Sequence, residues 1–167
     1  MNKENQSKIT ELIRQTKPLI FREMTHEKVM EKGAADYVTN VDVAVQNYLK
    51  ETLEKEFPKI RLIAEEKENL GLDPDKSYWI LDPIDGTTNL IRDYHLSAVS
   101  LGLYENGEIT FGVVYNPFTE ELFYGAKGEG AYLNGTPIHV SNQPEFKDAV
   151  VSFGSSPYEK NRAKELF

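Results

Sequence analysis

Apolar residues recur at helical spacing in the first third of the chain and predict two helices. The first covers residues 9–20, where isoleucine and leucine recur three or four positions apart among charged and amide side chains. Pro18 lies inside this pattern, and we expect a kink or break there because proline removes a helical hydrogen bond and crowds the preceding turn. The second helix has Asn40 as its predicted N-cap and ends at Phe57-Pro58. Residues 23–35, between the two, show no period and predict a mobile connection.

After Pro58 the pattern changes to short apolar runs separated by turn residues, which is typical of strands. Asn-Gly pairs at 106–107 and 134–135 stand between such runs and predict hairpins. The expected strands are residues 60–64, 78–81, 95–104, 109–115, 122–124, 131–133, 138–140 and 149–153, followed by a helix over 159–167. Helices followed by hairpin-linked strands indicate an α+β fold, with two N-terminal helices packed on a largely antiparallel sheet.

Length and charge narrow the class of protein. The chain has 167 residues, which suits one core, and carries 19 Lys and Arg against 27 Asp and Glu, a net charge of −8. This excess of acid argues against binding to nucleic acid or an anionic membrane, because both require clustered cations. No apolar run approaches the roughly 20 residues of a membrane span, and the first residues lack the apolar core of a signal peptide. We therefore expect a cytoplasmic protein.

Acidic residues gather in three clusters at the ends of apolar elements, at residues 36–42, 63–66 and 79–89. A carboxylate at the carboxyl end of a strand can project into a crevice. Several carboxylates converging there would repel one another unless cations lay between them. The chain has no cysteine and only three histidines, which disfavours zinc and favours a hard cation such as Mg²⁺ with oxygen ligands.

The third cluster carries the most chemical information. Asp82 and Asp85 are three positions apart with a proline between them, so a fixed turn can aim both carboxylates at one point. Gly86 allows close approach of the backbone, and Thr87-Thr88 can begin a short helix whose N–H groups hold a phosphate. A metal pair beside an anion-binding helix start is the equipment for phosphoryl hydrolysis.

Each feature also has an ordinary structural explanation when taken alone. Asp-Pro and Asp-Gly pairs usually form turns, and Glu65-Glu66 resembles many solvated pairs. Asp42 suits the first turn of a helix, where the helix dipole favours negative charge. The catalytic interpretation therefore depends on the three clusters occurring together in this order.

That combination resembles a known family. Asp82-Pro-Ile-Asp-Gly-Thr-Thr-Asn89, preceded by Trp79-Ile-Leu, resembles the signature of the inositol monophosphatase family, part of the magnesium-dependent, lithium-sensitive phosphatase superfamily. Residues 36–42 resemble its D-x-V-T-x-x-D segment, and residues 63–66 resemble its G-E-E segment with Ala64 in place of glycine. The resemblance implies a layered sugar-phosphatase-like fold. Residues 1–153 would form the N-terminal metal-binding domain, and residues 154–167 would begin the crossover into a C-terminal α/β half, whose W-D-x-A motif has no match here.

The resemblance also implies the metal ligands. Glu65, Asp82 and the carbonyl of Ile84 would hold one Mg²⁺ ion, and Asp82 and Asp85 would hold a second. Glu66 would lie behind these ligands or bind through water. Two or three ions are implied, with Mn²⁺ able to substitute, and lithium would inhibit by displacing a weakly held ion.

The same resemblance assigns catalysis and substrate binding. Thr87, oriented by Asp42, would act with Glu65 to activate the attacking water. The N–H groups of Gly86 and Thr87 would hold the substrate phosphate. The remaining substrate contacts would come from Glu65, Ile84 and Asp85.

The expected function is magnesium-dependent hydrolysis of a small phosphorylated polyol such as inositol 1-phosphate. The superfamily also acts on 3′-phosphoadenosine phosphate, fructose 1,6-bisphosphate and NADP, and these substrates stay open. An alternative of another class is a catalytically incomplete module that binds metal or serves as an association surface. The resemblance and the unpaired edges of the expected sheet also favour a homodimer.

Overall fold

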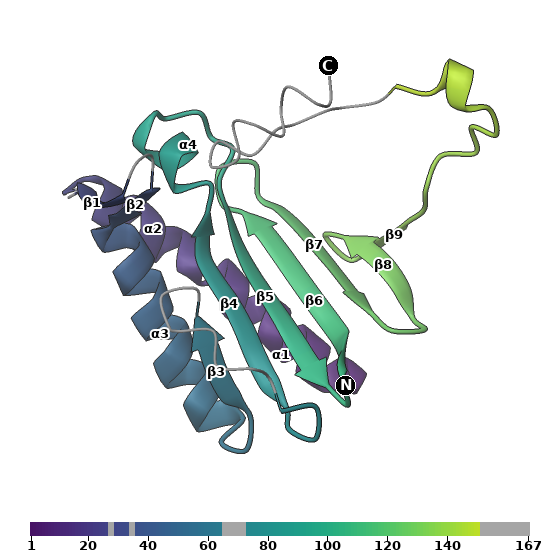
Figure 1. The fold of residues 1–167 in the computed structure, drawn as a ribbon, viewed down its shortest axis with the longest axis horizontal. Coiled ribbons are helices and arrows are strands. Elements are labelled where there is room, and N and C mark those ends of the chain that lie inside the picture. Colours follow the sequence, from purple (N-terminus) through teal and green to yellow (C-terminus); the bar gives the residue numbers. More distant parts are fainter. Residues whose placement is uncertain (27–28, 34–35, 65–72, 151–167) are drawn as a thin grey trace.

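The computed structural model describes residues 1–26, 29–33, 36–64 and 73–150. Three long helices pack on a seven-stranded sheet, with a small hairpin beside them (Figure 1). The helices are α1 (Lys3–Arg14), α2 (Thr16–Met24), α3 (Asn40–Glu56), α4 (Thr87–Ile91) and the 3-10 turn η1 (Phe146–Asp148). The strands are β1 (Val29–Gly33), β2 (Asp36–Thr39), β3 (Arg61–Ala64), β4 (Tyr78–Asp85), β5 (Ala98–Glu105), β6 (Glu108–Asn116), β7 (Glu121–Ala126), β8 (Gly130–Leu133) and β9 (Thr136–Ile138).

The sheet is built almost entirely from hairpins. Its strands follow the order β3-β4-β5-β6-β7-β8-β9, so each strand pairs with its neighbour in the sequence. Only the β3–β4 pair is parallel, and the other pairs of this sheet are antiparallel. The strands β1 and β2 form a separate antiparallel pair. The predicted α+β fold with a largely antiparallel sheet is confirmed.

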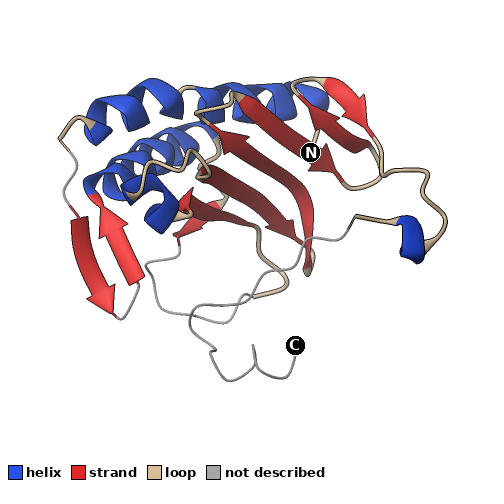
Figure 2. Cartoon of the chain, turned by 90° about the horizontal axis from the view of Figure 1, so that it is seen from above, coloured by secondary structure: helices blue, strands red, loops and turns tan. Residues whose placement is uncertain are grey.

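The core lies between the helices and one face of the sheet. Figure 2 shows α1, α2 and α3 on the same side of the strands. Alternate residues of β4, β5 and β6 point to this side and are almost fully buried, as are the apolar faces of the helices. The central members of this core are Ile9, Ile13, Val45, Leu49, Trp79, Leu81, Leu101, Leu103, Phe111 and Val113. None of the helices in the described part of the chain has the length and apolar character needed to cross a bilayer.

The helical region differs from its prediction in two details. The break expected at Pro18 is present but lies at Gln15, so that Pro18 is the third residue of α2. There its missing N–H costs nothing, because the first turn of a helix has no intrahelical acceptor. The connection predicted over residues 23–35 contains the end of α2 and the strand β1, which pairs with β2 just beyond it. Residues 27–28 and 34–35 lie outside the described residues.

The N-cap of α3 is Thr39 rather than Asn40. Thr39 has extended backbone angles, and its side chain accepts hydrogen bonds from the N–H groups of Val41 and Asp42. Both threonine and asparagine are good caps, so composition alone could not separate the two positions. Asp42 lies in the first turn of α3, as expected.

Strand boundaries shift where the backbone or the neighbours require it. The strand expected from His95 begins at Ala98, because Asp93 and His95 have positive φ angles of 55° and 57° that no strand accommodates. Ala149 and Val150 do not form the expected strand: Val150 is fully exposed, and neither residue pairs with a strand of the described part of the chain. The rest of that strand, the helix expected over 159–167 and the boundary expected at 153 lie outside the described residues.

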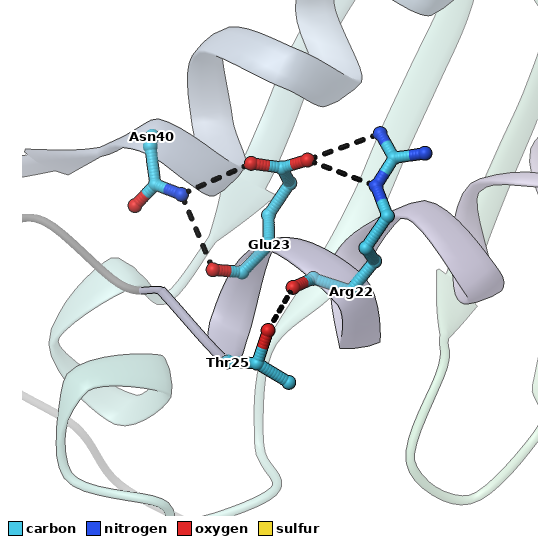
Figure 3. A network of polar contacts seen from close by, with 4 residues as sticks. All are labelled: Arg22, Glu23, Thr25 and Asn40. Carbon is cyan, nitrogen blue, oxygen red and sulfur yellow. Dashed lines mark hydrogen bonds and ion pairs between the residues drawn. The ribbon is translucent and has the colours of Figure 1, made fainter.

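A polar network joins the end of α2 to the start of α3 (Figure 3). Arg22 donates through Nε and Nη2 to one carboxylate oxygen of Glu23, at 3.1 and 3.0 Å. The amide of Asn40 donates to the other carboxylate oxygen and to the carbonyl of Glu23, both at 3.2 Å. The bonds from Arg22 and then from Asn40 hold the pKa of Glu23 below its ordinary value.

This network predicts a pH-dependent contribution of Glu23 to stability. The pKa is lower in the folded protein, so the contribution is present above the ordinary pKa and is lost as the pH falls through the folded value. We expect Glu23→Gln to lower the melting temperature slightly near pH 7, and we expect this effect to shrink as the pH falls below the ordinary pKa of glutamate, about 4.3. Thermal unfolding by circular dichroism measures this. Glu51→Gln, an exposed change within α3, is the control. A difference that stays constant with pH would contradict the assignment.

The two faces of the sheet predict opposite tolerance to truncation. Leu101 on β5 is 1% exposed and faces the helices, whereas Val114 on the adjacent β6 is 42% exposed on the other face. Leu101→Ala should cost about 2–5 kcal/mol of unfolding free energy because it leaves a cavity. Val114→Ala should cost less than about 1 kcal/mol. Urea denaturation of both variants measures this, and equal losses would mean that the buried face is assigned wrongly.

Candidate active site

The candidate site forms where β4 ends and α4 begins (Figure 1). The buried side chains of Trp79 and Leu81 hold β4 in the core, and at Asp82 the sequence of the strand changes from apolar to polar. The pairing of β4 with β5 shifts between Asp82 and Asp85, which marks an irregularity in the strand. In a regular strand, residues three apart face opposite sides, and a bulge changes this alternation. Asp82 is half-buried and Asp85 is exposed, although Pro83 and Ile84 between them are both buried.

Hydrogen bonds within this turn fix its shape. The N–H of Ile84 donates to Oδ1 of Asp82 at 3.1 Å, which closes a local turn around the proline. The hydroxyl of Thr87 lies 3.0 Å from the carbonyl oxygen of Ile84. The carbonyl of Gly86 accepts from the N–H groups of Asn89 and Leu90 and starts α4. It also accepts from the buried hydroxyl of Ser97 at 2.9 Å.

Gly86 is required at this position for two reasons. Its φ is +84°, a left-handed conformation that side chains rarely adopt. A Cβ atom there would also lie 3.0 Å from the carbonyl oxygen of Leu96 and 3.1 Å from the Asn89 amide nitrogen. The turn from β4 into α4 therefore depends on glycine both for its backbone and for its space.

The start of α3 brings Asp42 to the same place. Asp42 is only 6% exposed, and its Oδ1 lies 3.3 Å from the hydroxyl of Thr87, which is 45 positions away in the sequence. Its Oδ2 accepts from both the N–H and the hydroxyl of Thr39. Thr87 has one hydroxyl proton and two acceptors within reach, Asp42 and the carbonyl of Ile84. This arrangement can hold or pass a proton between a bound molecule and a buried carboxylate.

The metal ligands expected from the sequence that lie among the described residues are Asp82, Asp85 and the carbonyl of Ile84, and all of them are oxygen donors. Oxygen donors suit Mg²⁺, whereas zinc prefers nitrogen and sulfur. Magnesium needs only one or two protein carboxylates, because water and phosphate complete its shell. Within residues 1–26, 29–33, 36–64 and 73–150, no three histidine, aspartate or glutamate side chains lie close enough together to hold one metal ion. Glu65 and Glu66, expected from the sequence to contribute, lie outside the described residues.

Two residues that sequence reasoning did not single out support the site. Thr39 is fully buried and holds Asp42, and its signal was present as a capping box, a threonine followed three positions later by an acidic residue. Ser97 holds the carbonyl of Gly86 from the far end of the loop after α4. Nothing in the local sequence marks Ser97, because its partner is eleven positions away.

The geometry at Gly86 predicts a specific cost of substitution. Gly107, in the β5–β6 hairpin, has the same kind of backbone with φ +85°, but a Cβ there would meet nothing within 4 Å. Gly107→Ala therefore isolates the backbone strain, about 1–2 kcal/mol. Gly86→Ala should cost more than Gly107→Ala, because its methyl group also collides with backbone. Chemical denaturation of the two variants measures the difference. Equal costs would show that the contact with Leu96 relaxes freely.

Comparison with known sequences identifies relatives of this chain. The model of the Inositol monophosphatase family matches residues 1–165. Inositol monophosphatase 3 of Solanum lycopersicum is 42% identical over 128 residues, which make up 74% of this chain and 47% of that protein. Fructose-1,6-bisphosphatase/inositol-1-monophosphatase of Aquifex aeolicus (strain VF5) is 38% identical over 134 residues, or 80% of this chain and 50% of the relative. The chain spans about half the length of the curated relatives it matches.

Solved structures agree with this assignment. An IMPase of Thermotoga maritima has a TM-score of 0.84 at 31% identity, covering 98% of this chain and 64% of its own. The crystal structure of an IMPase/NADP phosphatase complexed with Mg²⁺ and phosphate has a TM-score of 0.74 at 30% identity, covering 80% of this chain and 52% of its own. With a family match over almost its whole length and the same fold, this chain belongs to the inositol monophosphatase family.

Proposed function

We propose that the chain forms the metal-binding part of a divalent-metal-dependent phosphatase that hydrolyses a small phosphate monoester such as inositol 1-phosphate. The observation that carries this proposal is the contact between Asp42 and Thr87 beside the carboxylates of Asp82 and Asp85. Family membership and the likeness to a structure complexed with Mg²⁺ and phosphate support it.

In this proposal Asp82, Asp85 and the carbonyl of Ile84 hold Mg²⁺, together with Glu65 from outside the described residues. The number of ions, two or three, and the ability of Mn²⁺ to replace Mg²⁺ belong to the proposal as well. Bound Mg²⁺ supplies positive charge that lowers the pKa of a coordinated water and stabilises the phosphoryl oxygens. Glu66 would support these ligands from behind or through water.

In this proposal the residues of the chain transfer the proton that the attacking water loses. Thr87 accepts a proton from the attacking water through an oxygen lone pair while its own hydroxyl proton passes to Asp42. One water O–H bond breaks and one Asp42 O–H bond forms, so the transfer leaves Thr87 neutral. Glu65 is proposed to take part in the same activation.

The substrate phosphate is proposed to bind at the start of α4. The N–H groups of Gly86 and Thr87 belong to the turn that begins this helix, where backbone donors lack intrahelical acceptors. Glu65, Ile84 and Asp85 would complete the contacts with the substrate. A phosphorus atom held there would lie close to both the metal ligands and Thr87.

The choice of substrate stays open among several phosphate esters. Relatives at similar identity carry both fructose-1,6-bisphosphatase and inositol monophosphatase names, and a structural neighbour is an IMPase/NADP phosphatase. Phosphate release should be compared on inositol 1-phosphate, fructose 1,6-bisphosphate, NADP and 3′-phosphoadenosine 5′-phosphate under identical conditions. A strong preference for a nucleotide would overturn the polyol assignment.

The metal assignment predicts the effect of one substitution that keeps the shape of a side chain and removes its negative charge. In the natural full-length protein with Mg²⁺, Asp85→Asn should lower kcat/KM by more than about 100-fold, beyond the loss typical of a residue that only supports a ligand. Chelation of Mg²⁺ should abolish activity, and added Mg²⁺ should restore it. Asp75→Asn makes the same chemical change in the loop before β4, at the opposite end of that strand, and should leave the rate unchanged.

Release of phosphate measures these effects, and calorimetry with Mn²⁺ measures metal binding directly. An Asp85→Asn variant with the wild-type rate would refute the assignment. Metal binding without turnover in the full-length protein would favour the alternative of a catalytically incomplete metal-binding module.

A further inference from the structure

We propose that Thr39 is a positioning residue for the reaction, because its hydroxyl holds the Asp42 carboxylate in the orientation that presents Oδ1 to Thr87. This inference rests on the proposed function and extends it to a residue outside the expected site. Thr39 touches neither the metal ligands of β4 nor Thr87 in the hydrogen bonds of the structure. It would act through Asp42 alone.

The two carboxylate oxygens of Asp42 have separate partners. Oδ2 accepts from the N–H of Thr39 at 2.8 Å and from its hydroxyl at 2.7 Å. Oδ1 lies 3.3 Å from the hydroxyl of Thr87. Two donors on one oxygen restrict rotation of the carboxylate about its bond to Cβ, so the other oxygen is held toward Thr87.

The direction of the Thr39 hydroxyl proton follows from its other contacts. Oγ1 of Thr39 accepts from the N–H of Val41 at 3.1 Å and from that of Asp42 at 3.4 Å. A hydroxyl offers two lone pairs and one proton, and an ionised carboxylate can only accept. The proton therefore points to Asp42. Thr39 is 0% exposed and Asp42 6% exposed, so little water competes for these bonds.

This role can be separated from ordinary helix capping. Capping uses Thr39 as an acceptor for the N–H groups of α3, whereas positioning uses it as a donor to Asp42. Replacing an N-cap threonine with glycine lowers helix stability only slightly, but glycine has no hydroxyl to donate. Serine keeps both functions. The pair Thr39→Gly and Thr39→Ser therefore distinguishes the two roles.

The experiment uses the natural full-length protein with Mg²⁺ and inositol 1-phosphate. Thr39→Gly should lower kcat by about 10–100-fold, the range for partners that orient a functional group, with a much smaller change in KM. Thr39→Ser should restore kcat to within about threefold of wild type. Asn2→Gly removes the side-chain cap of α1, where Asn2 accepts from the N–H of Asn5 at 2.8 Å, and should leave kcat unchanged.

A double-mutant cycle tests the route of the effect. If Thr39 acts through Asp42 on Thr87, Thr39→Gly should cause little further loss of kcat in a Thr87→Val background. Full additivity of the two losses would overturn the inference. A Thr39→Gly variant with the wild-type kcat would show that Thr39 is only a helix cap.

A structural measurement separates failure of this inference from failure of the proposed function. Crystal structures of the Thr39→Gly and Thr39→Ser variants report the distance between Oδ1 of Asp42 and Oγ1 of Thr87 without any need for turnover. We expect it to exceed hydrogen-bonding range in the glycine variant and to stay near its present value in the serine variant. An unchanged distance in the glycine variant overturns the positioning role, whatever the activity of the protein. Absence of metal-dependent hydrolysis in wild type would instead overturn the proposed function.

Discussion

The packing of α3 against β3 and β4 determines where the polar groups of the site can lie. One face of α3 is apolar along its length, and each side chain of that face is at most 1% exposed. These side chains are Val41, Val45, Leu49 and Leu53. Each contributes about 1.5–3 kcal/mol by burial, far more than the surface contacts of the helix. The packing of this apolar face places the first turn of α3 beside the end of β4. As a result the carboxylate of Asp42, which lies in that turn, is buried rather than exposed to water.

Burial of the Asp42 carboxylate costs desolvation free energy, which hydrogen bonds and the apolar packing of α3 must offset. An unpaired buried carboxylate would be strongly destabilising, and here both oxygens have donors within reach. The donors come from two elements, the cap of α3 and the start of α4, so the position of α4 is tied to that of α3. The left-handed turn at Gly86 and the bond from Ser97 to the Gly86 carbonyl fix the same end of α4. The start of this short helix is therefore held both by the first turn of α3 and by the loop that follows α4.

Local patterns predicted most of the fold, and the misses have physical causes. The apolar stripe of α3 and the Asn-Gly turn at 106–107 each specify one structure, and both were predicted correctly. The β1–β2 hairpin was missed because its strands carry few apolar residues and show no alternation. Residues 149–150 have a strand-like composition but pair with none of the strands that the structure describes, and pairing as well as propensity decides whether a strand forms. Within the site, the turn from Asp82 to Thr87 could be predicted because its residues follow one another in the sequence. The meeting of Asp42 with Thr87 was available only through resemblance to a family, since no local rule joins residues 45 positions apart.

The hydrogen bonds of Thr39 have a consequence for efforts to stabilise this protein. Asparagine and aspartate rank at or above threonine as helix N-caps, so cap statistics alone would favour replacing Thr39 with either of them. Aspartate would place a second negative charge against a buried carboxylate, and neither replacement supplies a hydroxyl in the same position. A substitution of Thr39 therefore changes both the stability of α3 and the proposed orientation of Asp42. Gains in thermal tolerance are therefore better sought at exposed positions away from the contacts of Thr39 and Asp42.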